Sequence, residues 1–247
     1  MRSSGKIGTK FSIDMKERYA RQIMLPEIGM KGQEKLGCAR VLIVGVGGLG
    51  SPVALYLSAA GVGTLGIVDN DIVSLSNLQR QILYKECELG YSKSQAASLR
   101  INEISSKTTV SEYNTRLNLE NAFDIISEYD IVVDCSDNIA TRLLIDDVCA
   151  RQNKPFVYGA IDAYTGQVSV FDAQQNWRYI DLFPSATTAS TNPNSGQGVI
   201  GTLPGIIGSI QATEVIKLIT GLGTPLIARL FTIDIRSMES MILTYNS

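Results

Sequence analysis

Short apolar runs alternate along this chain with longer segments in which apolar residues recur at helical spacing. The runs are rich in Val and Ile, which is typical of strands that are buried on both faces. They lie at residues 40–44, 65–69, 131–134 and 155–158, with a further one near 108–113. Helical segments are indicated at residues 51–60, 93–104, 119–128, 141–153 and 204–221. Strands and helices that alternate in this way predict a parallel sheet with helices packed against it.

The C-terminal part of the chain adds a second strand pattern. Residues 166–171 alternate in character, and we expect them to pair antiparallel with a neighbour, for which residues 230–235 are a candidate. The sequence therefore predicts an α/β fold with a Rossmann-like, mostly parallel sheet and flanking helices, extended by antiparallel strands in the C-terminal part.

An N-terminal helical arm is expected over residues 1–36. Residues 15–36 contain helical pieces in which Tyr19, Ile23 and Leu25 are the predicted apolar anchors. Proline and glycine interrupt these pieces, so a single long helix is not expected.

The stretch at residues 185–198 differs in composition from the rest of the chain. It consists of small, polar and proline residues with too little apolar surface to order itself, which predicts a flexible crossover loop. No linker divides the remainder, so we expect one domain over residues 1–247.

The charge balance gives no electrostatic reason to expect a nucleic acid or a membrane as a partner, because the formal net charge is -2. The first ten residues lack the apolar segment of a signal peptide, and no apolar run is long enough to span a bilayer. We therefore expect a cytoplasmic protein.

The chain has 4 cysteines and no histidine. The cysteines form no CxxC pair, and buried free thiols are the expected state for them. The lack of histidine excludes Ser-His-Asp and Cys-His catalysis and every His-ligated metal site. Chemistry in this protein would rest on charge stabilisation and positioning, as in nucleotidyl transfer.

A glycine-rich loop, Gly45-Val46-Gly47-Gly48-Leu49-Gly50, joins the first predicted strand to the first predicted helix. Glycines let a phosphate approach the backbone, and the helix N-terminus offers free N–H groups. Asp69 follows at the next strand end, where it is placed to accept hydrogen bonds from ribose hydroxyls. This context predicts nucleotide binding, with a simple packing turn as the alternative.

Two basic residues beyond the glycine loop favour a triphosphate over a dinucleotide. Arg80 and Lys93 are suited to grip the β- and γ-phosphates of ATP, the group that leaves in adenylation. Ordinary solvated surface charge is the alternative reading of both residues.

The segment Asp134-Cys135-Ser136-Asp137-Asn138 stands at the end of another predicted strand, where ligands bind in open α/β sheets. Asp137 is placed there to hold Mg²⁺, a cation that favours carboxylate and phosphate oxygens. The alternative reading of Asp137 is a cap for the helix that begins near Thr141, and the two roles are compatible.

Together these segments resemble the ThiF/MoeB/HesA family, the bacterial relatives of ubiquitin-activating enzymes. The resemblance runs from about Arg18 to Leu243 and rests on RYARQ, GVGGLGSP, DNDIVSLSNLQRQ, GYSK, DCSDN and LPGIIGSIQATEVIKL. It implies an ATP-dependent adenylyltransferase. The substrate would be the C-terminal carboxylate of a small ubiquitin-like sulfur carrier ending in Gly-Gly, of the thiamin or molybdopterin type, and pyrophosphate would be released.

The resemblance also implies roles for individual residues. Arg21, Arg80, Lys93 and Asp137 would be catalytic, with Asp137 binding magnesium. Arg21 would reach into the site of a partner subunit, which implies a homodimer. The nucleotide-binding residues would be Gly45, Gly47, Gly48, Asp69, Asp71, Ser76, Asn77, Leu78, Gln79, Arg80, Lys93 and Asn138.

Two parts of the family pattern are missing from this sequence. Many members bind a structural zinc through two CxxC pairs, but residues 178–181 read RYID and no second pair follows, so no zinc is expected. Some thiamin-type members use a loop cysteine, and its position, near Asn194, carries no thiol. We expect the chain to stop at the acyl-adenylate or to rely on a separate sulfur donor.

Other functions stay open from the sequence. The carboxylate could belong to a peptide or to another ubiquitin-like protein. A catalytically silent ATP-binding subunit is less favoured, because Arg21, Arg80, Lys93 and Asp137 are all present. A dehydrogenase is weakened by the two basic residues and by the lack of a recognisable proton relay.

Overall fold

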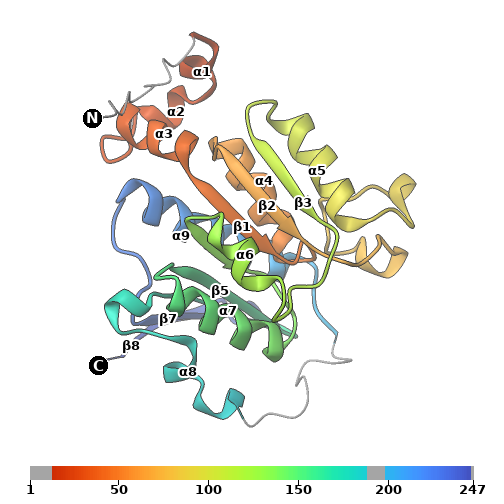
Figure 1. Cartoon of the computed structure of the whole chain (residues 1–247), viewed down its shortest axis with the longest axis vertical. Helices are drawn as coiled ribbons and strands as arrows, with labels where there is room; N and C mark the ends of the chain where they lie inside the picture. Colours follow the sequence, from red (N-terminus) through yellow and green to blue (C-terminus); the bar gives the residue numbers. More distant parts are fainter. Residues whose placement is uncertain (1–12, 188–197, 246–247) are drawn as a thin grey trace.

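One mixed sheet organises the computed structural model, which describes residues 13–187 and 198–245. In this part of the chain eight strands lie in the order β3-β2-β1-β4-β5-β6-β7-β8 (Figure 1). The parallel strands are β1 (Arg40–Val44), β2 (Thr64–Val68), β3 (Thr109–Tyr113), β4 (Ile131–Asp134) and β5 (Phe156–Asp162). The antiparallel extension consists of β6 (Thr165–Phe171), β7 (Arg229–Asp234) and β8 (Glu239–Thr244).

Helices cover both faces of the parallel strands. The main ones are α4 (Gly50–Ala60), α5 (Lys93–Ile104), α6 (Ala122–Ser127), α7 (Ile139–Arg151) and α9 (Thr202–Thr220). In β1, Val41 and Ile43 pack in a core shared with α4, α5 and α9, whereas Leu42 and Val44 pack in a second core with α6 and α7. Because both faces are covered, the strand reads as an unbroken apolar run.

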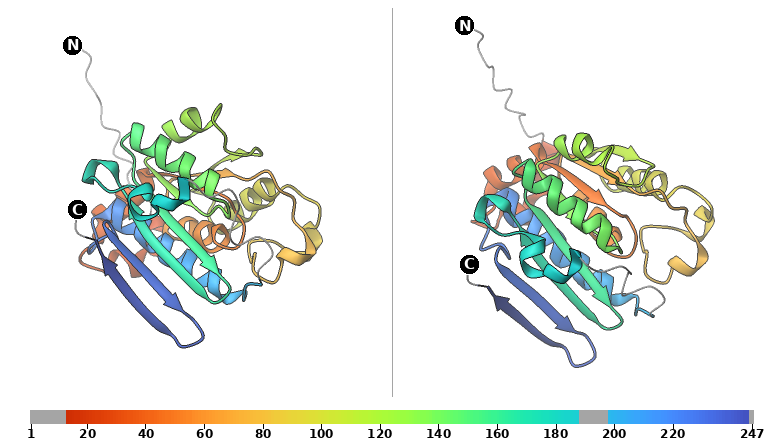
Figure 2. Two further views of the ribbon diagram at one scale, coloured as in Figure 1. Left: turned by 90° about the horizontal axis from the view of Figure 1, so that it is seen from below. Right: turned by 60° about the horizontal axis from the view of Figure 1, so that its bottom comes forward.

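The predicted fold class is confirmed. β1, α4 and β2 form the expected βαβ unit, and β7 pairs antiparallel with β6 as proposed for residues 230–235. The strand β8, which the sequence analysis did not predict, forms the outer edge of the sheet (Figure 2). All of its residues are exposed, and its apolar residues, Met241, Ile242 and Leu243, are consecutive and do not alternate with polar ones, so the strand period is missing.

The N-terminal region consists of α1 (Ile13–Arg18), α2 (Ala20–Ile23) and α3 (Gly29–Cys38). Tyr19 is buried as predicted, but Leu25 is 48% exposed and was wrongly named as an anchor. Ile28, only 6% exposed, is buried instead. The reason is that α2 ends before Leu25, which leaves that residue in the turn ahead of Pro26.

The remaining short elements are α8 (Tyr179–Leu182) and the 3₁₀ helices η1 (Leu75–Asn77), η2 (Glu86–Glu88), η3 (Ala173–Gln175) and η4 (Pro184–Thr187). The predicted crossover loop at 185–198 lies outside the described residues except at its two ends. No helix in the described ranges combines the length and hydrophobicity that a bilayer-crossing segment needs.

The cysteines divide into two pairs. Cys135 and Cys149 are buried as expected, and burial raises the pKa of both thiols. The expectation of buried thiols was wrong for Cys38 and Cys87, which are exposed because they lie at a helix end and in a surface 3₁₀ turn.

Alkylation of the native protein with iodoacetamide at pH 8 is expected to modify Cys38 and Cys87 quickly and to leave Cys135 and Cys149 unmodified. The thiolate is the reactive form, and burial suppresses both its formation and its access to reagent. Peptide mass mapping before and after unfolding checks this result. Rapid labelling of Cys135 in the native protein would contradict the packing described here.

Candidate active site

A cavity of about 460 Å³ opens at the carboxyl ends of the parallel strands. Its wall includes Val44 and Val68, the last residues of β1 and β2, and Cys135, which directly follows β4. Open α/β sheets bind their ligands at this edge, and the volume is in the range of small-molecule sites. The predicted site residues that line the cavity are Gly45, Gly47, Gly48, Asp69, Asp71, Arg80, Lys93, Asp137 and Asn138.

Asp69 fixes the glycine-rich loop. Its Oδ2 accepts the backbone N–H of Val46 at 2.9 Å, and its Oδ1 accepts the N–H of Asp71 at 2.9 Å. Burial of the Asp69 carboxyl raises its pKa, and these two backbone hydrogen bonds oppose the shift. As a carboxylate it retains lone pairs that can accept hydroxyl hydrogen bonds from a ligand.

Two glycines of the loop, Gly45 and Gly50, are explained by close backbone contacts. Gly45 has φ +87°, and a Cβ there would lie 2.9 Å from the carbonyl oxygen of Cys135. A Cβ on Gly50 would collide with the carbonyl oxygen of Gly45. The loop is therefore a tight turn that passes against the end of β4.

Arg80 and Lys93 bring positive charge to the cavity wall. Lys93 is the first residue of α5, and only 6% of its side chain is exposed. Its Nζ lies 2.8 Å from Oδ2 of Asp71, whose side chain is 64% exposed. Arg80 donates from Nη1 to the carbonyl oxygen of Ser76 at 3.0 Å. An anion in the cavity would thus meet two positive charges, one of them largely removed from water.

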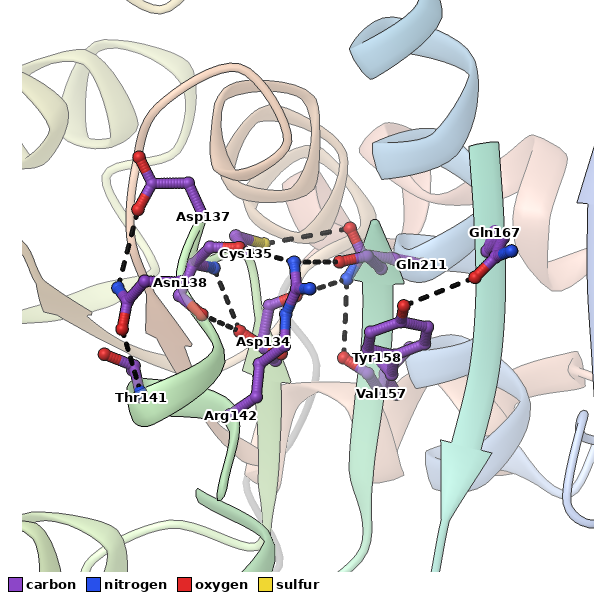
Figure 3. Close-up of polar contacts among 12 residues, drawn as sticks. Asp134, Cys135, Asp137, Asn138, Thr141, Arg142, Val157, Tyr158, Gln167 and Gln211 are labelled. Carbon is purple, nitrogen blue, oxygen red and sulfur yellow. Dashed lines mark hydrogen bonds and ion pairs between the residues drawn. The ribbon is translucent and has the colours of Figure 1, made fainter. Parts of the chain in front are cut away.

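Asp137 and Asn138 occupy the turn between β4 and α7 (Figure 3). Asn138 Oδ1 accepts the backbone N–H of Thr141 at 2.9 Å, so Asn138 caps the helix, and the alternative reading of Asp137 as the cap was wrong. Asp137 is exposed at the cavity wall, and the Nδ2 of Asn138 lies 3.5 Å from its Oδ1.

A single carboxylate at this wall is a suitable donor for Mg²⁺, which proteins commonly hold with one or two carboxylates together with substrate phosphates and water. Among the described residues no group of three or more His, Cys, Asp or Glu side chains is placed to hold a metal by itself. The donor set at Asp137 therefore fits a metal that arrives with a nucleotide.

Other predicted residues lie away from the cavity wall. Ser76 and Asn77 belong to η1, and Leu78 and Gln79 follow it in the turn that leads to Arg80. Arg21 is exposed on α2, in the N-terminal region, and does not line the cavity. Their roles toward a nucleotide or a partner subunit remain predictions.

Several parts of the cavity wall were not expected from the sequence, including Arg142 of α7, Gly198 and Val199, and two further segments. One is formed by residues 115–117, which follow β3, and the other by residues 161–163, the end of β5 and the start of its turn to β6. The strand-end reasoning that singled out Asp69 would have found the first segment, because a strand near 108–113 was expected. The second was missed because the predicted strand ended too early, at Tyr158.

A family model described as "ThiF family" matches residues 19–246. This chain belongs to the ThiF family. It is 47% identical over 216 residues to a "Probable molybdopterin-synthase adenylyltransferase" of Porphyra purpurea. The alignment covers 86% of this chain and 56% of that protein. It is 45% identical over 236 residues to "Adenylyltransferase and sulfurtransferase MOCS3-1" of Zea mays. This second alignment covers 93% of this chain and 50% of that protein. The chain thus spans about half the length of the curated relatives it matches.

Solved structures with the same fold include Escherichia coli MccB with MccA-N7isoASN, at a TM-score of 0.80 and 22% identity over 96% of this chain and 73% of MccB. Selenomethionine PaaA superposes with a TM-score of 0.78 at 23% identity, over 99% of this chain and 77% of PaaA. At these identities the likeness concerns the fold.

Proposed function

We propose that this protein uses ATP to adenylate the C-terminal carboxylate of a small ubiquitin-like sulfur carrier of the molybdopterin type. The observation that carries the proposal is the convergence of the glycine-rich loop, Arg80, Lys93 and Asp137 on one cavity. The names of relatives at 45% to 47% identity support the same reaction and the same carrier class.

The backbone of Gly45, Gly47 and Gly48 would face the phosphates, and Asp69 would accept ribose hydroxyls. Arg80 and Lys93 would stabilise the charge that accumulates on the leaving pyrophosphate. Mg²⁺, bound with the nucleotide and held by Asp137, would supply further neutralisation of the phosphate charge.

In the reaction, the ionised carrier carboxylate attacks the α-phosphorus of ATP. The new bond joins a carboxylate oxygen to that phosphorus, and the bond from the α-phosphorus to the bridging oxygen of the β-phosphate breaks. The products are an acyl-adenylate and pyrophosphate. No protein base is required, because the nucleophile carries no proton at neutral pH, and this agrees with a sequence that has no histidine.

Several finer features belong to the same proposal. The chain would act as one adenylation domain and as a homodimer, with Arg21 of each subunit reaching the other's site. Residues 185–198 carry no cysteine, so sulfur transfer onto the carrier would need a separate donor. Arg178 and Asp181 stand where a CxxC pair would bind zinc in other family members, so we expect no structural zinc.

The test is ATP–pyrophosphate exchange by the purified protein with Mg²⁺ and candidate carriers that end in Gly-Gly. We expect exchange that requires one carrier and disappears when its terminal glycine is removed. An Asp137→Ala variant serves as the control for site-specific exchange. If nucleotide binds but no carrier supports exchange, the proposed substrate is wrong, and a peptide carboxylate is then the next substrate to examine.

A further inference from the structure

Two opposite charges are buried directly beneath the turn that carries Asp137. Asp134, the last residue of β4, is 0% exposed, and Arg142 of α7 is 9% exposed. The Nε of Arg142 lies 3.3 Å from Oδ2 of Asp134. The guanidinium carbon also lies 5.2 Å from the ring centroid of Tyr158, which shields the charge from water on that side.

Stability alone does not explain this pair. The desolvation free energy of two buried charges offsets much of their Coulombic attraction. Apolar residues of similar volume can therefore often replace a buried ion pair without loss of stability. The direct contact is also imperfect, because neither Oδ2 of Asp134 nor Nε of Arg142 has a partner with hydrogen-bond geometry in the described residues. Both side chains make their shorter hydrogen bonds to a third residue and not to each other.

Those bonds converge on Ser136. Oδ1 of Asp134 accepts the backbone N–H of Ser136 at 2.9 Å and its hydroxyl at 2.6 Å. Nη2 of Arg142 donates to the carbonyl oxygen of Ser136 at 2.9 Å. Every polar group of Ser136 is therefore held by one of the two buried charges. Ser136 immediately precedes Asp137, so the start of the turn is fixed.

The surroundings of this turn are fixed as well. Asn138 is held on the other side of Asp137 by its cap to α7. Beneath the turn, Nε2 of Gln211 donates to the carbonyl oxygen of Asp134 at 2.8 Å and so ties the end of β4 to α9. Asp137 is thus an exposed carboxylate on a backbone that is anchored before it, after it and below it (Figure 3).

We propose that Arg142 is a positioning residue, which acts with Asp134 through Ser136 to present the Asp137 carboxylate to the metal that accompanies the nucleotide. This inference rests on the proposed function, because it assumes that Asp137 holds Mg²⁺. Partners one step removed from a metal ligand commonly change metal affinity about 10- to 100-fold when they are altered. Only the fork of arginine reaches the Asp134 carboxylate and the Ser136 carbonyl together.

The decisive variant is Arg142→Lys, which keeps the buried charge but loses the fork. We expect the Mg²⁺ concentration for half-maximal exchange to rise about tenfold, with the maximal rate largely restored by excess Mg²⁺. Mn²⁺ binding to the protein with α,β-methylene-ATP, followed by electron paramagnetic resonance, should weaken by a similar factor. Arg142 also lines the cavity. Binding of the same nucleotide analogue in EDTA should still change less than about twofold, because lysine keeps the positive charge and the glycine loop, Arg80 and Lys93 are untouched.

The matched control is Arg178→Lys. Arg178 also pairs with a buried acid of α7, since its Nη2 lies 2.8 Å from Oδ2 of Asp146, but neither residue lines the cavity. This variant should melt earlier and bind Mn²⁺ as the wild type does. Ser136→Ala, which removes only the 2.6 Å hydroxyl contact, is a milder variant and should weaken Mn²⁺ binding about two- to threefold.

Two results would overturn the inference. One is unchanged Mn²⁺ binding in both Arg142→Lys and Ser136→Ala, and the other is an equal loss of nucleotide binding with and without metal. The Mn²⁺ measurement needs no carrier and no turnover. If the wild-type protein binds Mn²⁺ with the nucleotide but exchanges with no carrier, the proposed substrate fails while the role of Arg142 is still decided.

Discussion

Replacing Lys93 with methionine is expected to lower the rate of carrier-dependent ATP–pyrophosphate exchange by about 10²–10³-fold, the usual effect of removing one preorganised hydrogen-bond donor from a developing anion. Lys93 is suited to that role because its side chain is only 6% exposed. A cation held away from water interacts more strongly with a phosphate than a solvated one does.

The fold should survive this substitution. Asp71 loses its ion partner, but its side chain is 64% exposed and can be solvated by water. Methionine keeps most of the length and apolar character of the lysine stem. We therefore expect the melting temperature to change little while exchange falls.

The control for Lys93→Met is Lys85→Met. Lys85 is also a lysine in an ion pair, 3.6 Å from Glu103, but its side chain is 49% exposed and outside the cavity wall. This variant should retain the exchange rate within about twofold. Exchange is measured with radiolabelled pyrophosphate at saturating ATP and carrier. A loss of less than tenfold in Lys93→Met would remove Lys93 from the catalytic residues.

The parallel core could be predicted from the sequence because its physical cause is local. The strands β1 and β4 are buried on both faces, so nearly every residue in them is apolar. Gly45 marks the carboxyl end of β1, and Asp134 marks that of β4. The helix α5 follows the predicted bounds, 93–104, for a similar reason: its apolar residues recur at helical spacing. Leu25 shows the limit of such patterns, since an apolar residue in a turn can point to solvent.

The support beneath the candidate active site could not be predicted in the same way. An arginine in a helix is expected at the surface, and only the fold brings Arg142 under the end of β4. Some signals were present. Asp134 ends a fully apolar run and needs a buried partner, and Gln211 interrupts the apolar residues of α9. Both indicated buried polar contacts, but neither indicated which residue would be the partner.

The glycine-rich loop leads to a second large effect. Gly50→Ala is expected to lower the free energy of unfolding by about 3 kcal/mol, since the new Cβ has to displace backbone and not a flexible side chain. The obstructing atom is the carbonyl oxygen of Gly45. The Gly45 backbone cannot shift toward β4, because it already packs on the backbone of Cys135. Nucleotide binding should be lost along with stability.

Gly205→Ala is the matched change for this experiment. Gly205 lies inside α9, and a Cβ there would meet no heavy atom within 4 Å. This variant should raise the free energy of unfolding by about 0.5–1 kcal/mol, because alanine loses less backbone entropy in a helix than glycine does. Urea denaturation followed by circular dichroism measures both variants. Equal stability of Gly50→Ala and the wild type would mean that the loop can shift by itself. The tight turn inferred from Gly45 would then not be what holds the loop backbone in place.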